Sequence, residues 1–146
     1  MKLELLKLKK QNIPLIADIY REEFSKFPYN EPWTKKQGIE KIKFLNKYCE
    51  IYVISVDKEI VGFIAINSQF MYPGQIAFGE ELAIKSDFQN KGIGTWTLRK
   101  IFSIYQQKGF SKFMGIGAKK GKAIRLYKKL NILPSKENVL IERRLK

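Results

Sequence analysis

Apolar side chains recur along the chain with two different spacings. Over residues 3–8 they alternate with charged ones, as in a strand with one face toward water. Over residues 15–24 and 39–49 they recur every three to four positions, which predicts two amphipathic helices. Asn12 suits the cap of the first helix, and Thr34-Lys35-Lys36-Gln37 is a capping box that opens the second.

Strand patterns follow these helices and then alternate with helical ones. Three apolar segments, residues 51–56, 60–66 and 75–85, are separated by the turns Asp57-Lys58-Glu59 and Pro73-Gly74, which predicts three consecutive strands. The remaining predicted elements are a helix over 92–108, a strand over 112–118, a helix over 121–130 and a last strand over 138–145.

This order, βααβββαβαβ, predicts an α/β (α+β) fold with a mixed central sheet and helices on its faces. The short turns between residues 51 and 85 favour antiparallel pairing there. The strand, helix and strand from residue 75 to residue 118 form a crossover unit, which favours parallel pairing. Neither an internal repeat nor a linker interrupts the chain, so we expect a single domain over residues 1–146.

The 146 residues include one cysteine, Cys49, and no histidine. This excludes a disulfide within the chain, a cysteine-based metal site and catalysis by a histidine base, and we expect no metal. The first ten residues mix charged and apolar side chains, unlike a signal peptide. The longest uncharged stretch, residues 60–79, is broken by polar residues, unlike a membrane span. We therefore expect a cytoplasmic protein with no membrane partner.

Positive charge is concentrated in the second half of the chain. Residues 1–84 carry 12 Lys or Arg and 11 Asp or Glu, whereas residues 85–146 carry 16 and 3, and the whole chain has a net charge of +14. The second half is therefore expected to bind a polyanion, such as nucleic acid, an anionic membrane or a phosphorylated cofactor.

Residues 81–95 carry the clearest chemical signal. A strand runs into a loop that contains Gly92 and Gly94 and opens a helix. The unpaired N–H groups at a helix start bind anions, and glycines let a bulky phosphate approach the backbone. The segment thus predicts a pyrophosphate site, to which Lys91 adds a positive charge. A Rossmann fingerprint would need a third glycine, and a P-loop would need Ser or Thr where Ala123 stands.

Two motifs resemble those of the GCN5-related N-acetyltransferase (GNAT) superfamily. Gln89-Asn90-Lys91-Gly92-Ile93-Gly94 resembles its Q/R-x-x-G-x-G/A loop, and Ala123-Ile124-Arg125-Leu126-Tyr127-Lys128-Lys129-Leu130 resembles its A-x-x-L-Y-E-K-L helix. Their separation and the element order also fit, so the resemblance covers essentially the whole chain. Asn30-Glu31-Pro32-Trp33-Thr34 is similar to a stretch of members related to aminoglycoside acetyltransferases. The chain departs from the pattern at Ser86, where proline is common, and at Lys120, where asparagine often contacts the cofactor.

The resemblance implies a GNAT-like, mostly antiparallel sheet and an acyl-CoA N-acyltransferase with acetyl-CoA as its co-substrate. In such an enzyme a strand backbone pairs with the pantetheine arm, and the loop that follows binds the pyrophosphate. The implied cofactor-binding residues are Leu82, Ala83, Ile84, Gln89, Asn90, Lys91, Gly92, Ile93, Gly94, Thr95 and Lys120.

The resemblance also implies two catalytic side chains. Tyr127 matches the tyrosine that lies near the thioester sulfur, where a phenol can protonate the departing thiolate. Glu81 or Glu80 lies where members often place a base, and we prefer Glu81 because it directly precedes the Leu-Ala-Ile run. Because side chains alternate along a strand, we expect only one of these two glutamates to face the cleft.

The acceptor is expected on the side of the first two helices. Glu22, Glu23 and Glu31 would attract a cationic amine, and Tyr29 and Trp33 would form a flat wall. The resulting hypothesis is direct transfer of the acetyl group, in a ternary complex, to a primary amine of a small molecule or peptide. Two alternatives stay open, a non-catalytic acyl-CoA-binding protein of the same fold and a basic nucleic-acid-binding module. A homodimer also stays open, and no specific nucleic-acid partner is expected.

Overall fold

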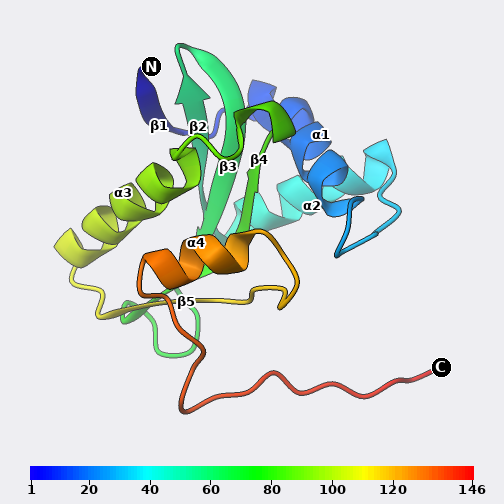
Figure 1. Ribbon diagram of the computed structural model, residues 1–146. Helices are drawn as coiled ribbons and strands as arrows, with labels where there is room; N and C mark the ends of the chain where they lie inside the picture. The colour runs from blue at the N-terminus through cyan, green and yellow to red at the C-terminus, as the bar shows by residue number, and fades with distance from the viewer.

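The computed structural model describes all residues from 1 to 146 and shows a five-stranded sheet flanked by helices (Figure 1). The strands are β1 (Leu3–Lys7), β2 (Glu50–Val56), β3 (Glu59–Asn67), β4 (Ile76–Ile84) and β5 (Lys112–Gly115). The helices are α1 (Ile13–Phe24), α2 (Lys35–Tyr48), α3 (Ile93–Gln107) and α4 (Ala123–Lys129), with the short 3-10 turns η1 (Lys10–Asn12) and η2 (Ser86–Phe88).

The strands lie in the sheet in the order in which they occur along the chain, from β1 to β5. Neighbours are antiparallel from β1 to β4, as the short turns between them predict. The pair of β4 and β5 is parallel because α3 carries the chain across between them. The mixed, mostly antiparallel sheet expected from the sequence is therefore confirmed.

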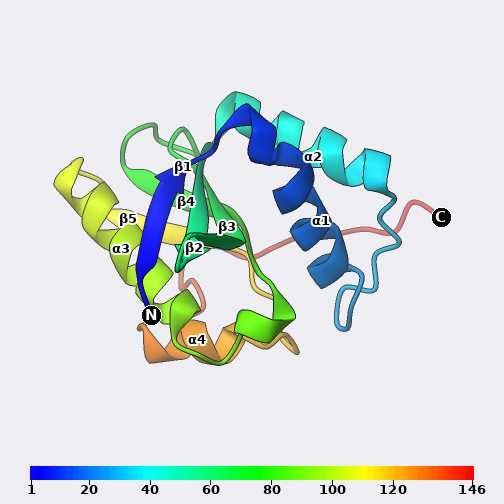
Figure 2. The same ribbon diagram turned by 90° about the horizontal axis from the view of Figure 1, so that it is seen from above.

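The helices cover both faces of the sheet (Figure 2). Alternate strand residues such as Phe63, Ala65 and Ala83 pack with the apolar faces of α1 and α2. The intervening residues, such as Ile64 and Ile66, pack with α3 on the other face, where the apolar side chains of α4 join them. This period of two in the strands and the helical spacing in α1 to α4 are what the sequence pattern predicts.

Two irregularities open the sheet beside β4. Ala65 pairs with Glu81 and Ile66 pairs with Gly79, so Glu80 is an extra residue in a β-bulge. On the other side, β5 pairs with β4 only from Ile76 to Gly79. Beyond Gly79, β4 therefore has β3 along one edge and no strand along the other.

The ends of several elements match the local signals in the sequence. Thr34 and Gln37 form both hydrogen bonds of the capping box of α2. Gly109 and Asn131 have the positive φ angles expected after α3 and α4. Asn12 lies at the cap of α1, but its side chain makes no capping hydrogen bond, so that part of the expectation is wrong.

The last predicted strand, residues 138–145, is not formed. The chain has no regular structure after α4, and residues 139–146 make no backbone hydrogen bond. A strand needs a neighbour for its N–H and C=O groups, and this segment lies against none within the chain. No helix of the protein has the combination of length and apolarity that crossing a lipid bilayer requires.

Candidate functional site

The loop before α3 presents a run of free backbone N–H groups. The N–H groups of residues 90–95 have no acceptor within the chain, whereas the N–H of Trp96 already bonds to Gly92 at 3.0 Å. Asn90 and Gly92 have positive φ angles, 60° and 80°, which turn the chain into the helix. No atom lies within 4 Å of the position that a Cβ of Gly92 would take. These residues form an open site for an anion at the start of a helix.

The residues of this loop differ in whether their backbone N–H groups are free and in how exposed their side chains are. The N–H of Gln89 bonds to the carbonyl of Ser86 at 3.1 Å, so the expectation that it is free for a phosphate is wrong. Asn90 and Lys91 are exposed, and the Lys91 ammonium lies 5.6 Å from the centre of the Phe88 ring. The side chain of Ile93 is buried in the core. Gly94 and Thr95 are half-buried.

The open edge of β4 adjoins this loop. The N–H of Lys85 bonds to Val61 in β3 at 2.8 Å, and alternate residues of a strand face alternate edges. The backbone groups of Leu82 and the N–H of Ile84 therefore face the open edge, whereas the Ile84 carbonyl already accepts from the Gln89 side chain. Ala83 faces β3 and buries its side chain against α1 and α2. An extended ligand chain could pair with this edge as an added strand.

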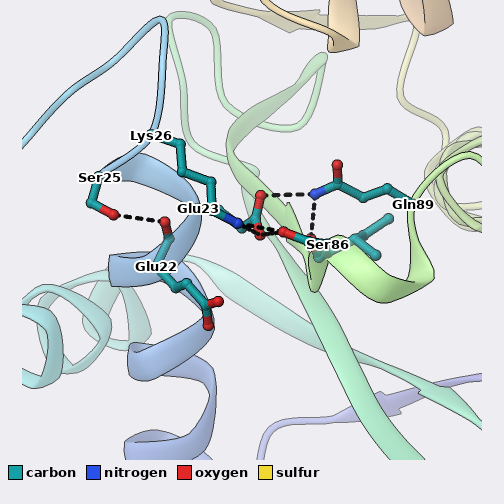
Figure 3. A network of polar contacts seen from close by, with 7 residues as sticks. Glu22, Glu23, Ser25, Lys26, Ser86 and Gln89 are labelled. Atoms are coloured by element: carbon teal, nitrogen blue, oxygen red, sulfur yellow. Dashed lines mark hydrogen bonds and ion pairs between the residues drawn. The ribbon is translucent and has the colours of Figure 1, made fainter.

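A polar network joins α1 to the same loop (Figure 3). The Gln89 amide donates to the carbonyl of Ile84 at 2.7 Å and to the Glu23 carboxylate at 2.8 Å. The other oxygen of Glu23 accepts from Ser86 Oγ at 2.9 Å and from Lys26 Nζ at 3.2 Å. The Gln89 side chain thus supports the loop from within and leaves its outward N–H groups free.

Glu81 lies on the α1 and α2 face of β4, largely shielded from water. Its carboxylate accepts from Tyr20 Oη at 3.4 Å and lies 3.9 Å from Lys41 Nζ. Burial raises the pKa of Glu81 from 4.5 to about 7, although Lys41 and the Tyr20 hydroxyl act in the opposite direction. A carboxyl group with this pKa can take up and release a proton near neutral pH.

The bulge alters the relation between Glu80 and Glu81. Glu80 accepts from the side-chain amide of Asn67 at 3.2 Å. Burial, with contributions from both carboxylates, raises the pKa of the Cys49 thiol to about 12. The extra residue at Glu80 interrupts the strict alternation of side chains that the sequence predicts for this strand.

Tyr127 lies on α4, where its side chain is half-buried. Its ring packs on the loop after β5, where a Cβ at Gly117 would lie 3.2 Å from the ring. Burial raises the pKa of Tyr127, and Tyr29 and Glu81 raise it further, so the phenol stays protonated above its ordinary range. The neighbouring Leu126 lies against Gly94, which joins α4 to the start of α3.

A shallow cavity of about 520 Å³, wide open to solvent, lies between α2 and the connection that leads into it. Its lining residues are Glu31, Pro32, Trp33, Gln37, Glu40, Lys41 and Phe44. The Trp33 indole donates to the Glu31 carboxylate at 3.0 Å, and the Trp33 ring meets Tyr20 edge-on at 5.0 Å between ring centres. Lys41 lines the cavity and also reaches Glu81, so the cavity adjoins that carboxylate.

The structure brings some of the other expected residues to this region and leaves one outside. Burial raises the pKa of Tyr29, and the negative charges of Glu81 and Glu31 raise it further. Lys120 is exposed in the turn before α4. The side chain of Glu22 is exposed, makes no hydrogen bond or ion pair, and points away from the network of Glu23 (Figure 3).

Two residues of the site carry no recognisable signal in the sequence, and a third makes contacts other than those expected. The sequence pattern predicts only that Tyr20 is a core residue of α1 and that Lys41 is a solvent-exposed lysine of α2. Glu23 was one of three acidic residues expected near the acceptor, but it contacts the loop before α3 instead. The serine at position 86, in place of the more common proline, is the one hint of this contact in the sequence, because its hydroxyl donates to Glu23.

A family model matches most of the chain. The model of the acetyltransferase (GNAT) family matches residues 13–132, and the chain belongs to this family. It is thus an acetyltransferase by family. No curated relative matches the sequence.

Several solved structures share the fold at low sequence identity. A possible acetyltransferase from Clostridium difficile 630 has a TM-score of 0.82 and 12% identity, with 100% of both chains covered. The aminoglycoside N-acetyltransferase AAC(6')-Iy in complex with CoA has a TM-score of 0.75 and 10% identity, with 99% of this chain and 96% of that one covered. A ribosomal-protein-alanine N-acetyltransferase from Brucella melitensis biovar Abortus 2308 has a TM-score of 0.76 and 12% identity, with 98% and 100% covered.

Proposed function

We propose that the protein transfers an acetyl group from acetyl-CoA to a primary amine of a small cationic molecule, by direct attack in a ternary complex. The observation that carries the proposal is the run of six consecutive free N–H groups, residues 90–95, beside the open edge of β4. The free N–H groups can hold a pyrophosphate, and the open edge of β4 can pair with a pantetheine arm, so together they fit acetyl-CoA. A structural neighbour in complex with CoA supports this donor.

The acceptor side fits a positively charged amine. The carboxylates of Glu31 and Glu40 line the cavity beside α2, and Trp33 and Phe44 contribute aromatic rings. Carboxylates and ring faces both attract ammonium groups. One of the structural neighbours is an aminoglycoside N-acetyltransferase, which supports an amine acceptor here.

Glu81 and Tyr127 are the groups proposed to move protons. Glu81 accepts the proton that the acceptor amine must lose before it can attack the acetyl carbonyl carbon, directly or through a water molecule. The C–N bond then forms and the C–S bond breaks, and Tyr127 donates its phenolic proton to the departing sulfur. Backbone N–H groups at the open edge of β4 polarise the carbonyl oxygen during the attack.

The test combines binding with turnover. Thermal unfolding is measured with acetyl-CoA, with longer acyl-CoAs and with ATP, since a ligand bound only by the folded state raises its stability. CoA release is then measured with polyamines, aminoglycosides, a peptide with a free N-terminus, and the hydroxyl analogue of the best amine. Stabilisation by acetyl-CoA and release with amines but not with the hydroxyl analogue are expected. Release of CoA that does not depend on any amine would contradict the proposal.

A further inference from the structure

Lys41 brings a primary amine of the protein itself to the carboxylate proposed as the base. Its Nζ lies 3.9 Å from Oε1 of Glu81, and its side chain lines the cavity beside α2. Among the ion pairs of the protein, Glu81 has no other partner. The candidate base therefore already faces an amine of the kind that the reaction would consume.

The contact leaves the Lys41 amine free to move. Tyr20, not Lys41, donates the hydrogen bond to Glu81 Oε1, and Lys41 Nζ makes no hydrogen bond. Lys85 and Lys108, in contrast, each donate a hydrogen bond to the carboxylate with which they pair. Because a lysine ammonium sits on a flexible four-carbon stem, Lys41 can turn toward a group that binds next to Glu81.

The acyl donor would end at the same carboxylate. The edge of β4 is open from Ile84 to the point where β5 begins to pair, at Gly79. An acyl-carrying arm that starts at the free N–H groups of residues 90–95 and pairs along this edge therefore ends beside Glu80 and Glu81. The second oxygen of Glu81, Oε2, makes no hydrogen bond or ion pair, so it is free to accept a proton there.

We propose that the site acetylates its own Lys41 when no free amine fills the cavity. This inference rests on the proposed function, since acetyl-CoA supplies the acetyl group and Glu81 acts as the base. Lys41 Nζ gives a proton to Glu81 and attacks the carbonyl carbon of the thioester. The C–N bond forms, the C–S bond breaks, and the departing sulfur takes a proton from Tyr127. The products are N-acetyl-lysine and CoA, and Glu81 and Tyr127 return to their starting states by exchanging protons with water.

Acetylation of Lys41 limits the activity of the site. It replaces an ammonium with a neutral amide and adds an acetyl group to the lining of the acceptor cavity, so a free amine finds less room beside Glu81. A free amine that binds first keeps Lys41 away from the thioester. The reaction is therefore favoured when acetyl-CoA is abundant and the acceptor is scarce.

The first experiment follows the acetylation of each lysine by peptide mass spectrometry, after incubation with acetyl-CoA alone. Lys85 is the reference, since it also pairs with a carboxylate, that of Glu59, and its side chain is 32% exposed against 30% for Lys41. Lys41 should react roughly a hundredfold faster than Lys85, because a positioned base contributes at least about that factor. The rate per chain should not depend on protein concentration, and Glu81→Gln should reduce it to that of Lys85.

The second experiment measures CoA release with the best free amine after preincubation with acetyl-CoA. The wild-type protein should lose activity as Lys41 becomes acetylated, and the amine, if present during preincubation, should protect it. Lys41→Arg keeps a positive charge beside Glu81, but its guanidinium stays protonated and is not a nucleophile, so its activity should not change during preincubation. Lys108→Arg is the control, since Lys108 pairs with Glu50 outside the cavity, and it should lose activity as the wild type does.

The possible outcomes distinguish this inference from the proposed function. Stabilisation by acetyl-CoA and turnover of free amines, with Lys41 no more acetylated than Lys85, would overturn the inference and leave the proposed function intact. Equally fast acetylation of Lys41 in Glu81→Gln would also overturn it, because the reaction would then be uncatalysed. So would a rate per chain that rises with protein concentration, since one copy would then modify another. If acetyl-CoA neither stabilised the protein nor acetylated Lys41, both the inference and the proposed function would be wrong.

Discussion

The side-chain amide of Gln89 donates to the carboxylate of Glu23 at 2.8 Å, across 66 positions of sequence. This contact fixes the end of α1 against the loop whose N–H groups are free. The chain continues from α1 into the connection that carries Tyr29, Glu31 and Trp33. One carboxylate therefore links the proposed donor side to the proposed acceptor side.

Removing this link should weaken binding of the donor more than catalysis. In Glu23→Ala, Gln89 and Ser86 lose their shared acceptor, and the loop no longer holds its N–H groups in one orientation. We expect the dissociation constant for CoA to rise about tenfold, because this factor corresponds to the free energy lost with one hydrogen bond to a charged group. The value of kcat should stay within about twofold of wild type. Calorimetric titration with CoA measures the first value without turnover.

The control for Glu23→Ala is Asp18→Ala. Asp18 is on the same helix and pairs with Arg21 at 3.2 Å, but it does not contact the loop. If Glu23→Ala bound CoA with the same dissociation constant as the wild-type protein, the network would support only the fold and not the binding of CoA.

Gly92 and Gly109 offer a matched test of the anion site, because they lie at opposite ends of α3. Their φ angles are 80° and 88°, and no atom lies within 4 Å of either Cβ position. Alanine at each position should cost a similar 1–2 kcal/mol of stability, about the penalty for a left-handed residue with a Cβ. Only Gly92→Ala should also reduce the affinity for CoA, because its methyl group points into the open site. Equal affinities of the two variants would argue against this site.

Tyr127→Phe removes the proposed proton donor and keeps the ring. We expect kcat to fall about a hundredfold, within the usual range for general acid catalysis, with little change in the affinity for CoA. Burial raises the pKa of the phenol, so between pH 7 and pH 10 the wild-type enzyme should lose less rate than a phenol of ordinary pKa would cause. Tyr72→Phe, at an exposed position, is the control. Turnover of Tyr127→Phe equal to wild type across this pH range would reject the role.

A structural feature can be predicted from the sequence when the residues that determine it are close together along the chain. The capping box at Thr34, the turn at Gly109 and the loop at Gly92 are set by a few adjacent residues, and all are found as expected. The pairing of Glu81 with Tyr20 and Lys41 joins three elements, and no local pattern encodes it.

Two features were mispredicted because they depend on neighbours across the sheet. The bulge at Glu80 appears only in the register of β4 on β3, so the unbroken alternation expected over Glu80 and Glu81 is not found. The pattern of residues 138–145 is that of a strand, but pairing also needs a free edge within reach, which their own sequence does not encode.

Glu81→Gln should separate catalysis from stability. The pKa of Glu81 is raised from 4.5 to about 7 by burial, so the folded protein holds this proton more tightly than the unfolded chain does. The stability that the protonated group contributes is complete below pH 4.5 and is lost as the pH rises toward and through 7. Glutamine does not titrate, so the variant should exceed wild type in free energy of unfolding by up to about 3 kcal/mol at pH 8, at 1.36 kcal/mol per pKa unit. Urea unfolding at pH 5 and pH 8 measures how this difference grows.

The same substitution should remove the rise of activity with pH. In the wild-type enzyme kcat/KM should increase through about pH 7 as Glu81 loses its proton and becomes able to act as a base. Glu81→Gln should be slow at every pH, whereas Glu80→Gln should keep the rise, because Glu80 bonds to Asn67 and not to Tyr20 or Lys41. If the Glu80 variant lost the rise and the Glu81 variant kept it, the base would be Glu80. The stability difference would still report the buried carboxyl of Glu81, because it depends only on how tightly the folded protein holds that proton.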